Sequence, residues 1–194
     1  MNKLEGFLAL RELGLPSVPW EKYNKNIILD NDILWTVRCA VSKGNDINLP
    51  RRVGITAKEA REFADNLMDT MSANDLILYY PYFIAAKSGV IEISNGRTVI
   101  EAVKDDLWNL VTYNKVDVSI IFDDDLRFIG DVDFLAENEL YEIIDYCTMI
   151  RKKLGSTIQE GKSIILEWSF GCRSNMSKES VGLPSLVFYE IRTV

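Results

Sequence analysis

Apolar residues recur at the spacing of an amphipathic helix in three segments of the chain. Over residues 57–71 they lie three or four positions apart, and Thr56 with Glu59 forms a capping box in front of them. The same period over residues 137–153 ends in a basic last turn. The pattern over residues 3–13 ends at Gly14-Leu15-Pro16, which is a helix stop signal. These three segments are therefore predicted to be helices.

Most of the remaining apolar residues are β-branched or aromatic and lie in short runs, as is typical of β-strands. The dipeptide Asn95-Gly96 between two runs indicates a tight hairpin turn. The runs cluster between the helices without regular alternation, which predicts an α+β fold with mostly antiparallel sheets. Residues 41–55 and 171–184 show no such pattern and are predicted to be mobile loops. The predicted strands are residues 33–40, 76–83, 88–94, 98–103, 117–122, 164–170 and 186–192.

The composition narrows the class of protein. With 47% hydrophobic and 26% charged residues in 194, the chain matches an ordinary soluble globular protein. Its net charge of −7 argues against a nucleic-acid ligand, which needs a basic face. No apolar run approaches the roughly 20 residues that cross a bilayer, and the first residues lack the apolar core of a signal peptide. Three widely spaced cysteines without a CxxC pair favour a reduced, cytoplasmic setting.

The chain contains no histidine. This excludes the mechanisms that need an imidazole: histidine-based triads, the common catalytic zinc sites and phosphohistidine relays on this chain. Carboxylates, lysine, arginine, tyrosine or cysteine would have to carry any chemistry. Phosphoryl transfer needs histidine least, because it relies on positioning and charge neutralisation around a metal ion.

Two strand-like runs near the C-terminus each carry one carboxylate, Glu167 and Glu190. A carboxylate inside a buried strand is costly unless it is paired or binds a cation, although an exposed strand acid simply faces water. Strict alternation places Glu167 on one face of its strand, and Phe188, Glu190 and Arg192 together on one face of the other. Two such carboxylates beside an arginine would suit Mg²⁺ and a polyphosphate. Whether the two faces coincide depends on the strand register, which the sequence leaves open.

Several other features have both a structural and a functional interpretation. Arg38 lies inside an apolar run, so it needs an anionic partner, either a phosphate or an acid such as Asp46. Arg51 and Arg52 in the predicted loop are interpreted as solvated rather than as closing over phosphates. Trp108 is interpreted as a core residue and not as a stacking platform.

The run Asp123-Asp124-Asp125 resembles a metal cluster, but consecutive residues rarely converge on one ion, so an exposed turn is predicted. Cys39 and Cys172 lack a histidine that would activate them, and a structural role is predicted for both. The P-loop, GxGxxG and CxxC motifs are all missing, which leaves classical NTPase, Rossmann and zinc functions unsupported.

The order of several short motifs resembles the ATP-grasp-type nucleotide-binding domain of pyruvate phosphate dikinase and phosphoenolpyruvate synthase. Lys3 precedes Gly14 of a Gly-x-Pro turn by the spacing of that family's first helix. The run 35–40, Trp-Thr-Val-Arg-Cys-Ala, is similar to its Val-Arg-Ser-Ser-Ala strand. Leu166-Glu167-Trp168 resembles its Asp-Ile-Glu-Trp motif, and Glu190-Ile191-Arg192 resembles its Gln-x-Arg motif with Glu in place of Gln.

The resemblance implies an ATP-grasp-like fold of two small lobes around a cleft, with residues 1–75 as the N-terminal lobe and residues 76–194 as the C-terminal lobe. It implies ATP and Mg²⁺ as cofactors. It assigns Arg38 and Arg192 to catalysis and Glu167 and Glu190 to the metal. It also assigns five residues to nucleotide binding: Lys3, Arg38, Tyr80, Tyr82 and Arg192.

The chain departs from that family in two respects. The Gly-Leu-Gly-Glu turn of the family would fall near residues 104–108, which contain neither glycine nor glutamate, and the phosphohistidine and phosphoenolpyruvate domains are missing. Two hypotheses follow. The first is an ATP- and Mg²⁺-binding phosphotransferase that acts on an acceptor, which a separate protein partner would carry. The second is a degenerate, non-catalytic binding or regulatory subunit that keeps the fold. A third possibility is an unrelated α+β fold in which the motif matches are coincidental, and such a fold would lack a cleft between two lobes.

Overall fold

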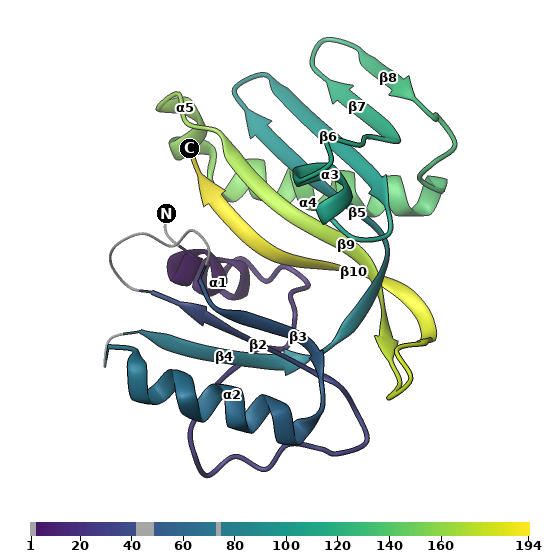
Figure 1. Ribbon diagram of the computed structural model, residues 1–194. Helices are drawn as coiled ribbons and strands as arrows, with labels where there is room; N and C mark the ends of the chain where they lie inside the picture. The colour runs from purple at the N-terminus through teal and green to yellow at the C-terminus, as the bar shows by residue number, and fades with distance from the viewer. Residues whose placement is uncertain (1–2, 42–48, 73–74) are drawn as a thin grey trace.

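Two antiparallel β-sheets form the framework of the protein (Figure 1). The computed structural model describes residues 3–41, 49–72 and 75–194, with only the backbone at Lys3. The smaller sheet has the strand order β1-β4-β2-β3, and the larger one has the order β10-β9-β5-β6-β7-β8. This arrangement confirms the predicted α+β fold with mostly antiparallel sheets.

The strands and helices follow one another without a regular alternation. The strands are β1 (Glu21–Lys22), β2 (Trp35–Ala40), β3 (Arg51–Ile55), β4 (Leu76–Pro81), β5 (Phe83–Ser94), β6 (Arg97–Lys104), β7 (Val118–Phe122), β8 (Leu126–Gly130), β9 (Ile164–Ser174) and β10 (Ser180–Thr193). The helices are α1 (Lys3–Glu12), α2 (Ala57–Thr70), α3 (Trp108–Val111), α4 (Glu137–Lys153) and α5 (Gly155–Gln159).

Helix α2 covers the lower face of the smaller sheet (Figure 1). The capping box that starts it is present: the Glu59 amide donates to the Thr56 hydroxyl at 3.3 Å, and the Thr56 amide donates to the Glu59 carboxylate at 2.9 Å. Its buried face consists of small residues and one leucine, Ala57, Ala60, Ala64 and Leu67. The small side chains let the helix lie close to Val37 and Tyr79 of the sheet.

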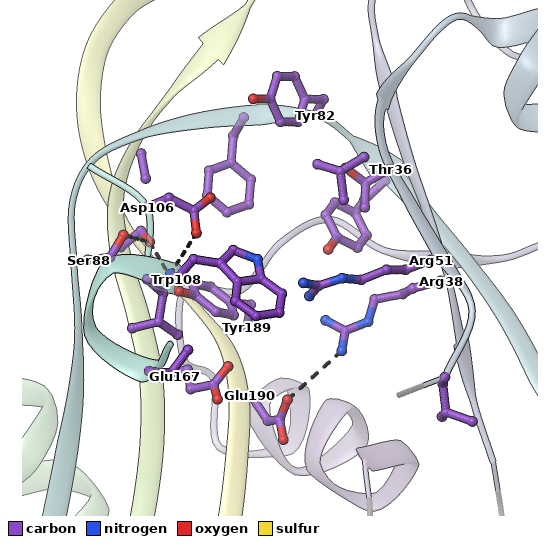
Figure 2. A pocket seen from close by; sticks show the side chains of 18 of the residues that line it. Thr36, Arg38, Arg51, Tyr82, Ser88, Asp106, Trp108, Glu167, Tyr189 and Glu190 are labelled. Carbon is purple, nitrogen blue, oxygen red and sulfur yellow. Dashed lines mark hydrogen bonds and ion pairs between the residues drawn. The ribbon is translucent and has the colours of Figure 1, made fainter. Parts of the chain in front are cut away.

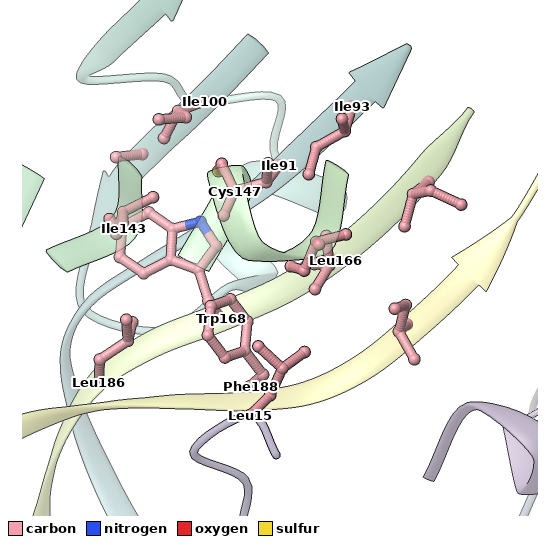
Figure 3. Packing of buried hydrophobic residues seen from close by; sticks show 14 of the residues in the cluster. Leu15, Ile91, Ile93, Ile100, Ile143, Cys147, Leu166, Trp168, Leu186 and Phe188 are labelled. Carbon is pink, nitrogen blue, oxygen red and sulfur yellow. The ribbon is translucent and has the colours of Figure 1, made fainter. Parts of the chain in front are cut away.

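Helix α4 covers the face of the larger sheet that is turned away from the smaller one (Figure 1). Ile143 and Cys147 of this helix pack on the central strands, where Trp168 is completely buried (Figure 3). Ile150 of the same helix belongs to this cluster as well. Burial of each isoleucine side chain stabilises the fold by roughly 1.5–3 kcal/mol. This main core holds β9 and β10 in place, and both strands carry candidate site residues on their other face.

Helix α1 lies between the two sheets and joins them. Phe7 is buried with Trp20, and both belong to a cluster that includes Leu78 and Tyr80 of β4. On the other side, α1 packs along β10, and a side chain at Gly6 would approach the Ile191 carbonyl oxygen to 2.5 Å. The glycine therefore allows the close contact that fixes β10 relative to the smaller sheet.

The three predicted long helices and the seven predicted strands are all present, with ends shifted by a few residues. The hairpin at Asn95-Gly96 joins β5 to β6, with Gly96 at a φ of 72°. The loop prediction for residues 41–55 was wrong at its end, because Arg51–Ile55 forms β3. The prediction for residues 171–184 was also wrong, since both ends of this segment extend the hairpin of β9 and β10. Strand β8 was not predicted.

The predicted division of the chain at residue 75 stays a prediction. Strand β4, directly after it, pairs with β1 and β2 in the smaller sheet, and the chain then enters the larger sheet through β5. Within the described residues, no helix is both long and apolar enough to span a bilayer.

Candidate functional site

A cleft of about 810 Å³ lies between the facing surfaces of the two sheets. Figure 2 shows that its charged side chains come from both sheets and point toward one another. Strands β2 and β3 contribute Arg38 and Arg51, and β9 and β10 contribute Glu167, Glu190 and Arg192. The remaining wall is largely aromatic or small: Tyr80, Tyr82, Phe83, Ala85, Ser88, Leu107, Trp108 and Tyr189 are among its residues.

Glu167 and Glu190 lie directly opposite each other on β9 and β10. The register shifts by one residue between Phe188, which pairs with Trp168, and Glu190, which pairs with Glu167. This β-bulge at Tyr189 turns Glu190 and Arg192 toward the cleft, while Phe188 and Ile191 both stay in the main core. The prediction that Phe188 shares a face with Glu190 and Arg192 was therefore wrong, and the bulge is what brings the two carboxylates together.

Two arginines neutralise the buried Glu190 carboxylate, which is only 5% exposed. The Arg38 guanidinium lies 3.9 Å from it, and Arg192 Nε donates to its other oxygen. Arg38 is itself buried against the ring of Phe7 at 5.0 Å. The predicted anionic partner of Arg38 is thus a protein carboxylate, Glu190; the alternative partner Asp46 lies outside the described residues.

Arg51 and Trp108 meet across the cleft. Arg51 is exposed, as predicted, but it belongs to β3 rather than to a loop. Its guanidinium lies 4.8 Å from the centre of the Trp108 ring. Trp108 is half exposed and lines the cleft, so its interpretation as a core residue was wrong. Neither residue was predicted to line the cleft, because β3 and α3 are short and carry little apolar pattern. Arg52 is exposed and stacks on Phe63 outside the cleft.

The predicted nucleotide-binding residues Tyr80 and Tyr82 both line the cleft. Burial and the nearby Asp106 raise the pKa of Tyr82, and burial raises that of Tyr189, so both hydroxyls stay protonated at neutral pH. Ser88 and Ser169 hydroxyls lie 2.8 Å apart on the wall beside Tyr189. The side chain of Lys3 lies outside the described residues.

The carboxylate pair fits a Mg²⁺ ion that a phosphate chain helps to hold. Opposed residues in an antiparallel pair have Cβ atoms about 4.5–5.5 Å apart, so both carboxylates can reach one ion. Mg²⁺ in phosphate-transfer sites takes one or two carboxylates and fills its octahedron with water and phosphate oxygens. The described residues contain no group of three or more acids or other ligating side chains that could hold a metal alone. Asp123, Asp124 and Asp125 lie in an exposed turn between β7 and β8, as predicted.

The cysteines are unsuited to nucleophilic chemistry. All three are free and buried. Burial, with a smaller contribution from Asp75, raises the pKa of Cys39 to about 11, and burial raises that of Cys147 to about 12. The reactive thiolate is therefore scarce at neutral pH, even though Cys39 lines the cleft.

We expect iodoacetamide to modify Cys39 in the folded protein only slowly at pH 7.5. Because the thiolate fraction rises tenfold per pH unit below the pKa, the rate should rise by about 100-fold between pH 7.5 and 9.5. Mass spectrometry of tryptic peptides measures this rate, with urea-unfolded protein as the control for an ordinary thiol. Rapid modification of the folded chain at pH 7.5 would contradict the raised pKa.

Comparison with known proteins identifies the fold. No family model and no curated sequence matches the chain. Among solved structures, it is similar to an L-amino acid ligase from Bacillus licheniformis, with a TM-score of 0.53 at 15% identity. The match covers 98% of this chain and 42% of that one. The chain has an ATP-grasp fold. Its two sheets with a cleft between them agree with the predicted architecture.

A second ligase gives a weaker match. The D-alanine–D-alanine ligase from Bacillus anthracis, in complex with ATP, aligns at a TM-score of 0.47 and 15% identity over 98% of this chain and 54% of that one. The chain thus spans only about half the length of these ligases. At this identity the likeness shows the fold alone, and it does not single out the pyruvate phosphate dikinase family.

Proposed function

We propose that the cleft binds ATP with Mg²⁺. The main support is the arrangement of charges on the facing walls of the cleft. Glu167 and Glu190 form an opposed carboxylate pair. Three arginines line the same cavity: Arg38, Arg51 and Arg192. A cleft of about 810 Å³ has room for a nucleotide, since ligand pockets commonly measure about 300–1,000 Å³. The ATP-grasp fold supports this function but does not establish it for this chain.

Each group has a role that its chemistry supports. Arg38 and Arg192 would bind and neutralise the phosphate chain, and Arg51 would contact it from β3. Tyr80, Tyr82 and Trp108 offer rings and hydroxyls to the base and ribose. Glu167 and Glu190 would hold the Mg²⁺ ion, which supplies charge neutralisation at the phosphate oxygens when bound. Burial of Arg38 and Glu190 keeps these groups in position before the ligand enters.

We further propose that the protein is a phosphotransferase related to pyruvate phosphate dikinase and phosphoenolpyruvate synthase. The order of the motifs around Arg38, Glu167 and Arg192 supports it. Because this chain has no histidine, a phosphohistidine acceptor would reside on a separate protein partner. The three free cysteines suit a reducing compartment such as the cytoplasm.

A non-catalytic binding or regulatory subunit is the second candidate. It is favoured by the segment that replaces the Gly-Leu-Gly-Glu turn of the resembled family. Residues 104–108 lack glycine, Asp105 has a φ of 61°, and the chain then enters α3, which places Trp108 in the cleft. A nucleotide bound without turnover would agree with this candidate.

The test is calorimetric titration of the protein with ATP, with and without Mg²⁺. We expect metal-dependent binding, and the Glu167→Gln variant should lose at least about tenfold in affinity because one metal ligand becomes neutral. The matched control is Glu142→Gln, which removes the same charge from an exposed position on α4.

Three outcomes separate the candidates. Binding that Glu167→Gln weakens and Glu142→Gln does not supports the site. Binding without phosphoryl transfer or hydrolysis favours the regulatory subunit. No heat at millimolar ATP, with both proteins folded, contradicts nucleotide binding.

A further inference from the structure

The ionic side chains of the described cleft wall balance one another. Three arginines, Arg38, Arg51 and Arg192, face three carboxylates, Glu167, Glu190 and Asp106. A polyphosphate without a cation is strongly anionic and gains little from a wall of zero net charge. A divalent cation bound at the carboxylate pair would give the same wall a net charge of two positive units.

Glu190 belongs to the carboxylate pair and also contacts two of the three arginines. It is nearly buried, it pairs with Glu167 across the strands, and its oxygens contact both Arg38 and Arg192. The two arginines that would bind phosphate are therefore held by the carboxylate that would bind the cation.

We propose that Glu190 is a specificity residue that excludes polyphosphates lacking a divalent cation. Without a cation, an incoming phosphate must compete with the Glu190 carboxylate for Arg38 and Arg192, and it meets that negative charge inside a buried site. Once a cation shares the carboxylate, the arginines can turn to the phosphate oxygens. Cation and phosphate then strengthen each other's binding by the same factor. This inference rests on the proposed nucleotide site.

The test compares wild type with Glu190→Gln, using inorganic tripolyphosphate in EDTA as the probe. We expect the variant to bind the metal-free probe at least about tenfold more tightly than wild type, because a negative charge within a few ångströms of the phosphates is removed. The gain from added Mg²⁺ should shrink in the variant. Glu142→Gln, with the same change in net charge, should behave like wild type.

The wild-type chain offers a second measurement that needs no variant. Sulfate associates only weakly with Mg²⁺ in solution, so it reports on the arginines. We expect sulfate to raise the melting temperature clearly when Mg²⁺ is present and little when it is absent.

The outcomes distinguish the inference from the proposed function. If the variant binds metal-free tripolyphosphate no better than wild type while both bind ATP with Mg²⁺, Glu190 is only a metal ligand and the inference is wrong. Equal stabilisation by sulfate with and without Mg²⁺ would overturn it as well. If neither protein binds ATP or tripolyphosphate under any condition, the proposed function fails and this inference fails with it.

Discussion

We expect the Arg38→Met variant to bind ATP with Mg²⁺ about 10- to 100-fold more weakly than wild type, since a hydrogen bond to a charged group contributes roughly 1.5–3 kcal/mol. Arg38 extends from β2 into the cleft and is buried beside Phe7. A flexible cationic side chain from the surface therefore cannot take over its position. Methionine keeps the apolar contact with Phe7 while it removes the charge. Calorimetric titration measures the affinity.

The same variant should lose about 1–3 kcal/mol of unfolding free energy in urea, because Glu190 loses one of its two arginine partners. The control is the double variant Arg38→Met/Glu190→Gln, in which the unpaired charge is also removed. Its stability should recover in part, while its affinity for ATP with Mg²⁺ should stay low. Recovery of the affinity in the double variant would show that Arg38 serves only to pair Glu190.

Replacement of Gly89 with alanine is expected to destabilise the protein by about 3 kcal/mol or more and to reduce soluble expression sharply. Gly89 lies on β5, between Ala102 of β6 and Trp168 of β9. An added Cβ would lie 2.5 Å from the Trp168 ring and would overlap the Glu101 carbonyl oxygen. Trp168 is completely buried, so it has no space into which it could move.

The control for this prediction is Gly155→Ala. Gly155 begins α5, and a Cβ there would meet no atom within 4 Å. That variant should be as stable as wild type or slightly more stable, because alanine favours a helix over glycine by about 1 kcal/mol. Urea unfolding of both variants measures the difference. A Gly89→Ala protein as stable as wild type would contradict the packing around Trp168.

The long helices and central strands could be predicted because local sequence and tertiary packing agree there. The capping box at Thr56 and the apolar period behind it specify α2 without help from the rest of the chain. Strands β3 and β8 were missed because they are short and largely exposed, so they carry little apolar signal. Because β3 was predicted to be a loop, Arg51 was placed in that loop, and its contact with Trp108 could not be predicted.

The alternation of side chains along a strand was not enough to predict the geometry of the carboxylate pair. Glu167 and Glu190 were identified from their place in apolar strands, but the face of Glu190 was set by the bulge at Tyr189. The sequence does contain a trace of that bulge. Leu186, Phe188 and Ile191 are apolar and buried, so the apolar spacing changes from two residues to three just before the end of β10. One extra residue reverses the face of every later side chain.

A crystal structure with Mn²⁺ and a non-hydrolysable ATP analogue would test the proposed site at the level of its ligands, because Mn²⁺ gives an anomalous signal that Mg²⁺ does not. We predict one anomalous peak within coordination distance of both Glu167 and Glu190, with the phosphate chain contacting Arg38 and Arg192. A nucleotide bound outside the cleft, or a peak at residues 123–125 and none at the carboxylate pair, would contradict the proposed site.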